Sequence, residues 1–165
     1  MNYGEIKDCD IANGIGIRVS LFVSGCTNRC PGCFQPQTWD FNYGQEFTRE
    51  TEDKILEMLK PDYITGLTVL GGEPFEPENQ VVLVPFLKRV KEAYPNKTIW
   101  SFSGFVLEDL MTEGTHCHTD VTMDMLNMLD VLIDGRFEQD LKNIKLRFRG
   151  SENQRLIDMN KTREE

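Results

Sequence analysis

Hydrophobic residues along the chain follow a strand-like period in some segments and a helical period in others. Apolar residues occupy every second position from Ile17 to Val23, which is the period of a β-strand, and this run ends at Ser24-Gly25. Three further short apolar runs also end in a glycine-containing turn. They are Leu67 to Leu70 before Gly71-Gly72, Thr98 to Phe102 before Ser103-Gly104, and Asp130 to Ile133 before Asp134-Gly135. The pattern predicts four strands with glycine at each carboxyl end.

Segments with helical spacing separate these strands. A helix is predicted from Thr48 to Lys60, where Pro61 stops it, and a second from Val82 to Tyr94. Pro85 is expected to begin or kink the second helix, because proline lacks the backbone donor that a helix interior needs. A third helix is predicted from Met123 to Leu129. Strands alternating with helices favour a parallel sheet with right-handed crossovers.

The order of elements also predicts where a ligand would bind. In parallel sheets the ligand site lies beyond the carboxyl ends of the strands, so the four glycine-marked ends should meet there. The chain has 165 residues, whereas a complete eight-fold barrel needs about 250. We therefore predict an α/β fold, an open partial (βα) barrel of parallel strands, with residues 1–165 forming a single domain.

Composition and charge argue against several classes of function. Eighteen Lys plus Arg against 27 Asp plus Glu give a formal net charge of -9, the wrong sign for broad binding to phosphate backbones. No apolar run approaches the ~18 residues of a membrane-spanning helix, and the first ten residues lack the layout of a signal peptide. We expect a cytoplasmic protein that binds neither nucleic acid nor membrane.

Three of the five cysteines lie within eight residues. Cys26, Cys30 and Cys33 have the spacing C-x3-C-x2-C, which lets one loop direct three thiolates at a metal centre. A closed structural zinc site needs four ligands, and no second C-x2-C half follows. A four-iron cluster takes one thiolate per iron, so three cysteines leave one iron open to a ligand that is not protein. The spacing favours an iron–sulfur cluster of the 4Fe-4S type.

Other interpretations of the cysteines stay open at this point. The three clustered cysteines could be incidental core residues, the ligands of a zinc-bound interaction domain, or part of a small electron carrier. The electron carrier would take its fourth ligand from Cys9 or Cys117. His116 and His118 flank Cys117 within a polar segment, residues 112–122, that we expect to be an exposed loop rather than a metal site.

Several segments together resemble a known superfamily. The C-x3-C-x2-C loop after a first strand and Gly71-Gly72-Glu73-Pro74 after a second resemble the radical S-adenosylmethionine enzymes. Asn13 to Cys26 and Asp134 to Phe137 are similar to its members that activate glycyl-radical enzymes. Arg149 to Asp158 resembles the closing motif of the branch acting on anaerobic ribonucleoside-triphosphate reductase, whose small size the chain shares. An activase of pyruvate formate-lyase or another glycyl-radical enzyme is the alternative within this family.

The resemblance, which spans roughly residues 10–158, implies roles for particular residues. Cys26, Cys30 and Cys33 would ligate three irons, and S-adenosyl-L-methionine would chelate the fourth. The Gly71-Gly72-Glu73 turn would meet the methionine amino group. Gly32, Cys33 and Phe34 would pack the cofactor beside the cluster. A helix N-terminal charge stabilised by the dipole is the alternative for Glu73.

The chain departs from the family pattern at two positions after the second cysteine. Gly32 stands where the wider superfamily commonly has an aromatic residue, and Phe34 is the expected substitute. Gln35 stands where the branch usually has Asn, and no role is assigned to it.

The implied function is that of an oxidoreductase that activates another enzyme. Reductive cleavage of S-adenosylmethionine at the cluster would give a 5'-deoxyadenosyl radical, which would generate a glycyl radical on the large subunit of anaerobic ribonucleoside-triphosphate reductase. A low-potential electron donor such as a flavodoxin would reduce the cluster.

The charge distribution suggests where the reductase docks. Residues 136–165 contain eight Lys plus Arg and six Asp plus Glu, whereas residues 1–135 contain ten and 21. We expect Arg147, Arg149 and Arg155 in this C-terminal segment to help dock the reductase, with an ordinary solvated face as the alternative. Trp39 and Trp100 are interpreted as core residues rather than as cofactor-stacking residues.

Overall fold

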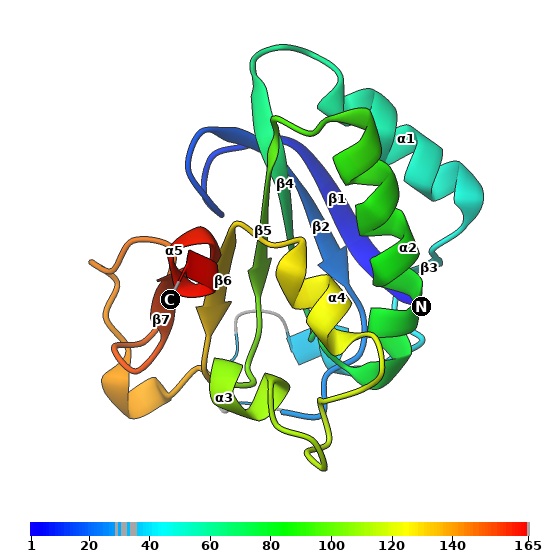
Figure 1. Cartoon of the computed structure of the whole chain (residues 1–165). Helices are drawn as coiled ribbons and strands as arrows, with labels where there is room; N and C mark the ends of the chain where they lie inside the picture. The colour runs from blue at the N-terminus through cyan, green and yellow to red at the C-terminus, as the bar shows by residue number, and fades with distance from the viewer. Residues whose placement is uncertain (29, 31–32, 34–35, 165) are drawn as a thin grey trace.

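A seven-stranded sheet forms the centre of the molecule in the computed structural model, which describes residues 1–28, 30, 33 and 36–164 (Figure 1). The order of strands across the sheet is β3-β1-β2-β4-β5-β6-β7. The strands are β1 (Asn2–Asp10), β2 (Ile17–Val23), β3 (Gln45–Glu46), β4 (Ile64–Gly71), β5 (Thr98–Phe102), β6 (Val131–Asp134) and β7 (Arg155–Asp158). The helices are α1 (Arg49–Leu59), α2 (Pro77–Ala93), α3 (Leu107–Leu110), α4 (Thr122–Asn127) and α5 (Met159–Glu164), with 3-10 turns η1 (Pro36–Trp39) and η2 (Gln139–Leu141).

The four predicted strands form the parallel centre of this sheet. β2 pairs with β4, β4 with β5 and β5 with β6, all parallel, which confirms the α/β prediction. Antiparallel strands extend both sides: β1 and β3 lie beyond β2, and β7 lies beyond β6. The sheet is open, with β3 and β7 as the edges of its described part. The prediction of parallel strands is therefore confirmed for the four central strands and is wrong for the strands on either side of them.

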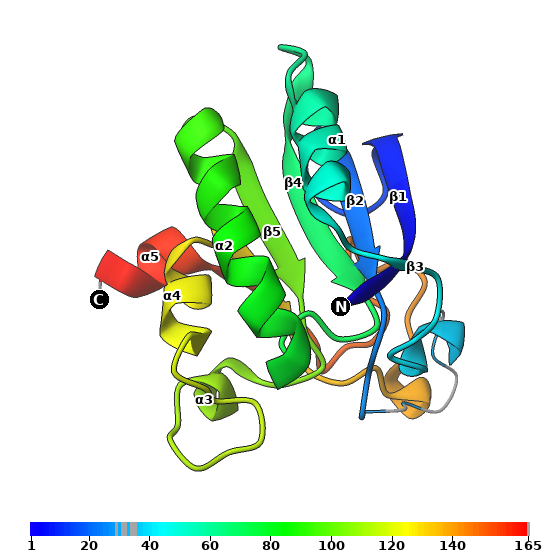
Figure 2. The same ribbon diagram turned by 90° about the vertical axis from the view of Figure 1, so that its right-hand side faces the viewer.

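The two faces of the sheet differ in chemistry. One face is aliphatic and packs under α1, α2 and α4, which lie together on that side in Figure 2. The opposite face carries polar and aromatic side chains at the alternate positions, because successive residues of a strand point to opposite faces. The helix-facing residues are Val19, Leu21, Val23, Leu67, Val69, Ile99 and Leu132, and the residues on the opposite face include Arg18, Ser20, Phe22, Thr68, Leu70, Trp100 and Phe102.

Arg18 is the largest buried residue on this polar and aromatic face and is 1% exposed. Its guanidinium donates to the Thr68 and Thr98 hydroxyls and to three backbone carbonyls. The guanidinium carbon lies 5.3 Å from the centre of the Trp100 ring. Burial lowers the pKa of Arg18 to about 10. A Cβ at Gly66 would lie 1.9 Å from the Thr98 carbonyl oxygen and 2.8 Å from the Arg18 Nη2 atom, so glycine makes the room this cation needs.

The helix boundaries differ from the predicted ones mainly at the start of α2. α1 and α4 match within two residues, but α2 begins at Pro77, five residues earlier than predicted. Proline is favoured at the first turn of a helix because no backbone donor is needed there, and Pro77 uses that position. Pro85 lies inside the helix and does not begin it.

Candidate active site

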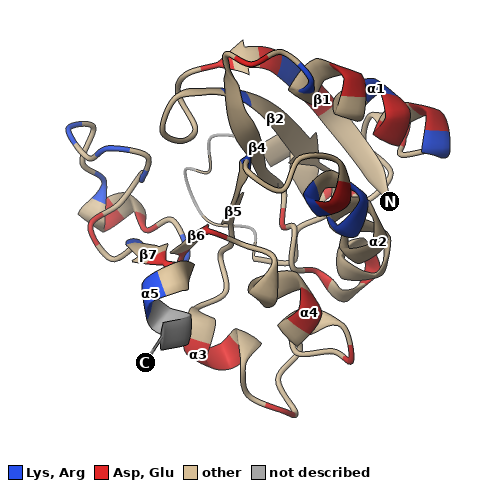
Figure 3. Ribbon diagram, turned by 45° about the horizontal axis from the view of Figure 1, so that its top comes forward, with Lys and Arg blue, Asp and Glu red and all other residues tan. Residues whose placement is uncertain are grey.

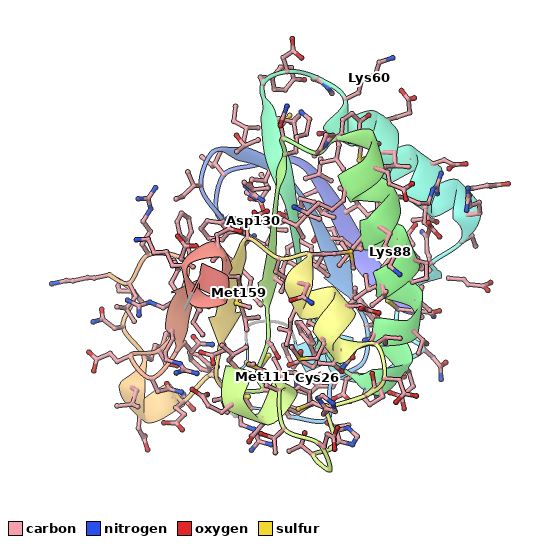
Figure 4. All side chains as sticks on the ribbon, viewed as in Figure 1. Cys26, Lys60, Lys88, Met111, Asp130 and Met159 are labelled. Carbon is pink, nitrogen blue, oxygen red and sulfur yellow. The ribbon has the colours of Figure 1, made fainter. Side chains whose placement is uncertain are left out.

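The carboxyl ends of the central strands meet at one edge of the sheet, as predicted. The Gly72 amide donates to the Val23 carbonyl at 2.8 Å, and the Ser103 amide donates to the Ile133 carbonyl at 2.8 Å. Figure 4 labels Cys26 at this end of the sheet. A cavity of about 590 Å³ opens here and runs along the polar and aromatic face, lined by residues from all four strand ends.

The three clustered cysteines line this cavity. Cys26 and Cys30 are both 9% exposed, Cys33 is half-buried, and the Cys33 amide donates to the Cys30 carbonyl at 3.0 Å. Burial raises the pKa of the Cys30 thiol, so this thiol stays protonated until a metal displaces the proton. Gly32, Phe34 and Gln35 lie outside the described residues.

The donor set fits a multi-iron cluster better than a single ion. A zinc ion needs its thiolate ligands within about 2.3 Å of one point. No three His, Cys, Asp or Glu side chains in the described part of the chain gather around one such point. A four-iron cluster is larger and attaches each thiolate to a different iron. Three thiols on the wall of a roomy cavity suit that arrangement.

The two remaining cysteines are not among the described residues that line the cavity. Cys9 is exposed on β1, and Cys117 is 2% exposed within the core; neither belongs to the described lining of the cavity. Neither is therefore placed to supply a fourth ligand.

The two glycines after β4 are needed for close approach. Gly71 has a φ of +113°, a left-handed conformation that favours glycine. A Cβ at Gly72 would lie 2.7 Å from the Gly25 carbonyl oxygen and 2.8 Å from the Thr38 carbonyl oxygen. The Gly71-Gly72 turn therefore packs directly against the backbone that leads into the cysteine loop.

Glu73 holds three of the strand ends together. Its carboxylate is 1% exposed and accepts hydrogen bonds from the Asn28 amide group, the Phe75 and Gly104 backbone amides and the Ser103 hydroxyl. Burial raises the pKa of Glu73 to about 7 despite these four donors. α2 begins four residues later, so the bonds of Glu73 do not fit the alternative interpretation as a helix-end charge.

Asn28 extends this network to the fourth strand end. Its side-chain oxygen accepts from Arg136 Nε at 3.1 Å, and its nitrogen donates to Glu73. Sequence analysis missed Asn28 and the role of Ser103. Asn28 lies between Cys26 and Cys30, and Ser103 precedes a glycine at the end of β5, and these positions are the sequence signal that could have identified them.

Residues 112–122 are less exposed than predicted. The segment was expected to be an exposed loop, but Cys117 is 2% exposed and packs in the hydrophobic core, and its carbonyl accepts hydrogen bonds from Gln80 and Thr122. The His116 ring reaches the fully buried Glu76 carboxylate at 3.1 Å. Only part of the segment is exposed.

The C-terminal segment also lines the cavity. Residues 142–144, 146 and 148–150, together with Gln154, line the cavity. Trp100 is 3% exposed, in agreement with its interpretation as a core residue, and its ring packs edge-on against Phe148 at 5.3 Å. Trp39 differs from its interpretation, since it is half-buried and lines the cavity.

The three C-terminal arginines have different environments, although Figure 3 shows Lys and Arg gathered on the segment between β6 and β7. Arg147 lies over the Phe148 ring at 4.7 Å. Arg149 lines the cavity, and Arg155 pairs with Asp134 and Glu108.

Comparison with known proteins identifies the family. Residues 12–157 match the family described as a 4Fe-4S single cluster domain. The anaerobic ribonucleoside-triphosphate reductase-activating protein of Pasteurella multocida (strain Pm70) is 44% identical over 156 residues, which cover 93% of this chain and 95% of the relative. The proteins of that name from Enterobacteria phage T4 and Escherichia coli (strain K12) are 41% and 39% identical, covering 94% and 93% of this chain and 93% and 96% of the relatives. The chain belongs to this family of activating proteins.

The matched region includes the segments on which the resemblance rested, except for the last residue of the closing motif. It contains the cysteine loop, the turn after β4 and the closing motif up to Ile157. No described helix is long and apolar enough to cross a membrane.

Proposed function

We propose that this chain activates anaerobic ribonucleoside-triphosphate reductase by generating a glycyl radical on its large subunit, using a 4Fe-4S cluster and S-adenosyl-L-methionine. One observation carries the proposal: the three cysteine side chains and the Gly71-Gly72 turn line the same cavity, at the carboxyl ends of parallel strands. Membership of a family named for this activation gives the partner.

The residues of the cavity have distinct roles in this proposal. Cys26, Cys30 and Cys33 would hold the cluster. When bound and reduced, the cluster would supply the one electron that breaks the bond from sulfur to the ribose carbon of the cofactor, giving methionine and a 5'-deoxyadenosyl radical. The Gly71-Gly72 turn contacts the methionine amino group through its backbone. The Glu73 carboxylate does not make this contact, because it already accepts hydrogen bonds from four donors of the protein. Cys33 packs the cofactor together with Gly32 and Phe34.

The walls of the cavity protect this chemistry from water. Phe22, Leu70 and Phe102 line it from three adjacent strands, and Phe148 lines it from the C-terminal segment. An apolar lining around the cluster favours a low dielectric and limits side reactions of a radical.

The fold, the docking surface, the electron donor and the location in the cell complete this proposal. We propose that the open sheet is a partial (βα) barrel, that residues 1–165 form a single domain, and that residues 136–165 include the reductase-docking surface. A low-potential donor such as a flavodoxin supplies the electron, and the protein works in the cytoplasm.

Electron paramagnetic resonance on anaerobically reconstituted, reduced protein tests the proposal. The cluster signal should change shape on adding S-adenosylmethionine, and adding the reductase should produce a glycyl-radical signal. Cys30→Ser should lose the cluster signal, whereas Cys9→Ser, at an exposed cysteine outside the cavity, should keep it.

Three results would count against the proposal. A cluster signal indifferent to the cofactor would favour an electron carrier. Failure to load a cluster would favour the interpretation of the three cysteines as zinc ligands or as incidental core residues. A radical formed on pyruvate formate-lyase but not on the reductase would favour the alternative activase.

A further inference from the structure

The closing motif of the chain is organised around the side chain of Gln154. The Gln154 Oε1 atom accepts from the Gly150 amide at 2.8 Å and from the Ser151 amide at 3.0 Å. Its Nε2 atom donates to the Gly135 carbonyl at 3.0 Å, which ties the turn to the end of β6. Its backbone carbonyl accepts from Arg149 Nη1 at 3.0 Å. The Gln154 side chain therefore holds the turn from Gly150 to Gln154 in place, and the Gln154 backbone carbonyl holds the Arg149 guanidinium.

One nitrogen of that guanidinium lacks a partner. The Arg149 Nε atom is buried and has no hydrogen-bond partner, although Arg149 lines the cavity that the cysteines line. Buried donors are nearly always paired, because an unpaired one loses its hydration without replacement. The Trp39 Nε1 atom is the other buried side-chain nitrogen or oxygen without a partner in the described part of the chain, and Trp39 lines the same cavity. Both atoms are hydrogen-bond donors on residues of the lining, so a ligand that pairs with them must bring an acceptor.

The charges of the lining indicate the chemistry of that ligand. Glu73 is the one acidic residue in the described lining, and its oxygens already accept four hydrogen bonds. Lys7, Lys142 and Arg149 are the basic residues of the lining. A guanidinium held at one Nη atom presents its remaining N–H groups in a planar fork that matches a carboxylate. The cavity therefore suits a ligand with a carboxylate.

We propose that Arg149 binds the carboxylate of the methionyl group of S-adenosylmethionine and that Gln154 positions Arg149 for this contact. The inference rests on the proposed function, since it assumes that this cofactor occupies the cavity. A carboxylate has two oxygens, so one can bind the open iron while the other accepts from Arg149. Arg149 is then a specificity-determining residue facing the cofactor, in place of the reductase-docking role expected from the sequence.

Binding measurements on the reconstituted holoprotein test this assignment without relying on turnover. S-adenosylmethionine and decarboxylated S-adenosylmethionine differ only in the carboxylate, so their dissociation constants can be compared by anaerobic equilibrium dialysis. Arg149→Gln should weaken binding of S-adenosylmethionine roughly 10- to 100-fold and leave binding of the decarboxylated compound unchanged. Arg149→Lys keeps the charge but not the fork, and should fall between. Arg147→Gln, two residues away, is the matched control and should change neither constant.

The outcomes separate this inference from the proposed function. Wild-type protein that binds no S-adenosylmethionine would reject the proposed function and this assignment with it. Wild-type protein that binds the cofactor, with an Arg149→Gln variant that weakens both compounds equally or neither, would overturn the assignment alone. Equal weakening of binding for both compounds would indicate that Arg149 stabilises the turn around Gln154 and does not contact the carboxylate.

Discussion

The buried carboxylate of Glu76 accepts two hydrogen bonds from Thr27, the residue that follows the first cysteine of the loop. The Glu76 Oε1 atom lies 2.8 Å from the Thr27 amide nitrogen and 2.5 Å from its hydroxyl oxygen. The other carboxylate oxygen lies 3.1 Å from His116 Nε2. Glu76 therefore connects the cysteine loop to the start of α2 and to the segment that carries His116.

Removing this carboxylate should loosen the cysteine loop. Glu76→Ala leaves both Thr27 donors without an acceptor, and we expect the free energy of unfolding to fall by about 2–4 kcal/mol. The loop should then retain less iron per chain after reconstitution. Urea denaturation of the metal-free protein and iron analysis measure the two effects. Glu78→Ala, at an exposed residue of the same helix, should cost less than about 1 kcal/mol. Equal effects of the two variants would contradict this role of Glu76.

The stability of the metal-free protein should depend on pH through Glu73. Burial raises the pKa of Glu73 from 4.5 to about 7, so the folded chain holds this proton more tightly than the unfolded chain does. The contribution of Glu73 to stability therefore falls as the pH rises from about 4.5 to about 7, by about 3 kcal/mol in total, and is constant above that range.

The variant Glu73→Gln isolates this effect. Its amide does not titrate, so the Glu73 contribution to the pH dependence should disappear. The unfavourable contact between the new NH2 group and the Phe75 amide should lower stability equally at all pH values. Urea unfolding at pH 5 and pH 8 measures the slope, with Glu78→Gln as the exposed control. An unchanged slope in Glu73→Gln would assign the pH dependence to other groups.

Arg155 should contribute to the stability of the folded chain and not only to docking of the reductase. It pairs with Asp134, which is fully buried and also accepts from the Leu107 amide, and with the exposed Glu108. The two carboxylates raise the pKa of Arg155. Arg155→Gln leaves the buried Asp134 charge without its cation, and we expect a loss of about 1–3 kcal/mol, moderated by the solvent exposure of Arg155. Glu108→Gln, the matched control, should cost less than about 1 kcal/mol. Urea unfolding that shows no loss for Arg155→Gln would favour a docking role alone.

The sequence predicted those parts of the fold that depend on local pattern. The buried central strands and their glycine ends could be identified because each combines a run of apolar residues with a residue that permits unusual backbone shapes. The outer strands β1 and β7 could not, since much of each strand is exposed and its charged residues resemble a loop. The Glu73 and Glu76 networks were also missed, because their partners lie from two to 49 residues away along the chain.

The reductase should approach the open side of the cavity near Ile144. A radical formed inside the cavity can reach a glycine of the reductase only if that glycine enters the same cavity. Ile144 lines the cavity and is 89% exposed, the largest value among the exposed large hydrophobic residues described. It lies between Lys142 and Lys145 in the segment where basic residues gather. An exposed apolar side chain with basic neighbours, at the opening of the site, suits the contact with the partner.

Ile144→Glu tests this docking position. The variant should slow formation of the glycyl radical on the reductase roughly tenfold, because it places a charge in the apolar contact. Cleavage of S-adenosylmethionine by the chemically reduced protein alone should not change, because Ile144 is too exposed to hold the cofactor. Val81→Glu, at a residue 59% exposed on α2, is the control, because α2 covers the opposite face of the sheet. Docking at Ile144 is excluded if both variants activate the reductase at the wild-type rate, and a parallel loss of cofactor cleavage in Ile144→Glu would place Ile144 in the cofactor site instead.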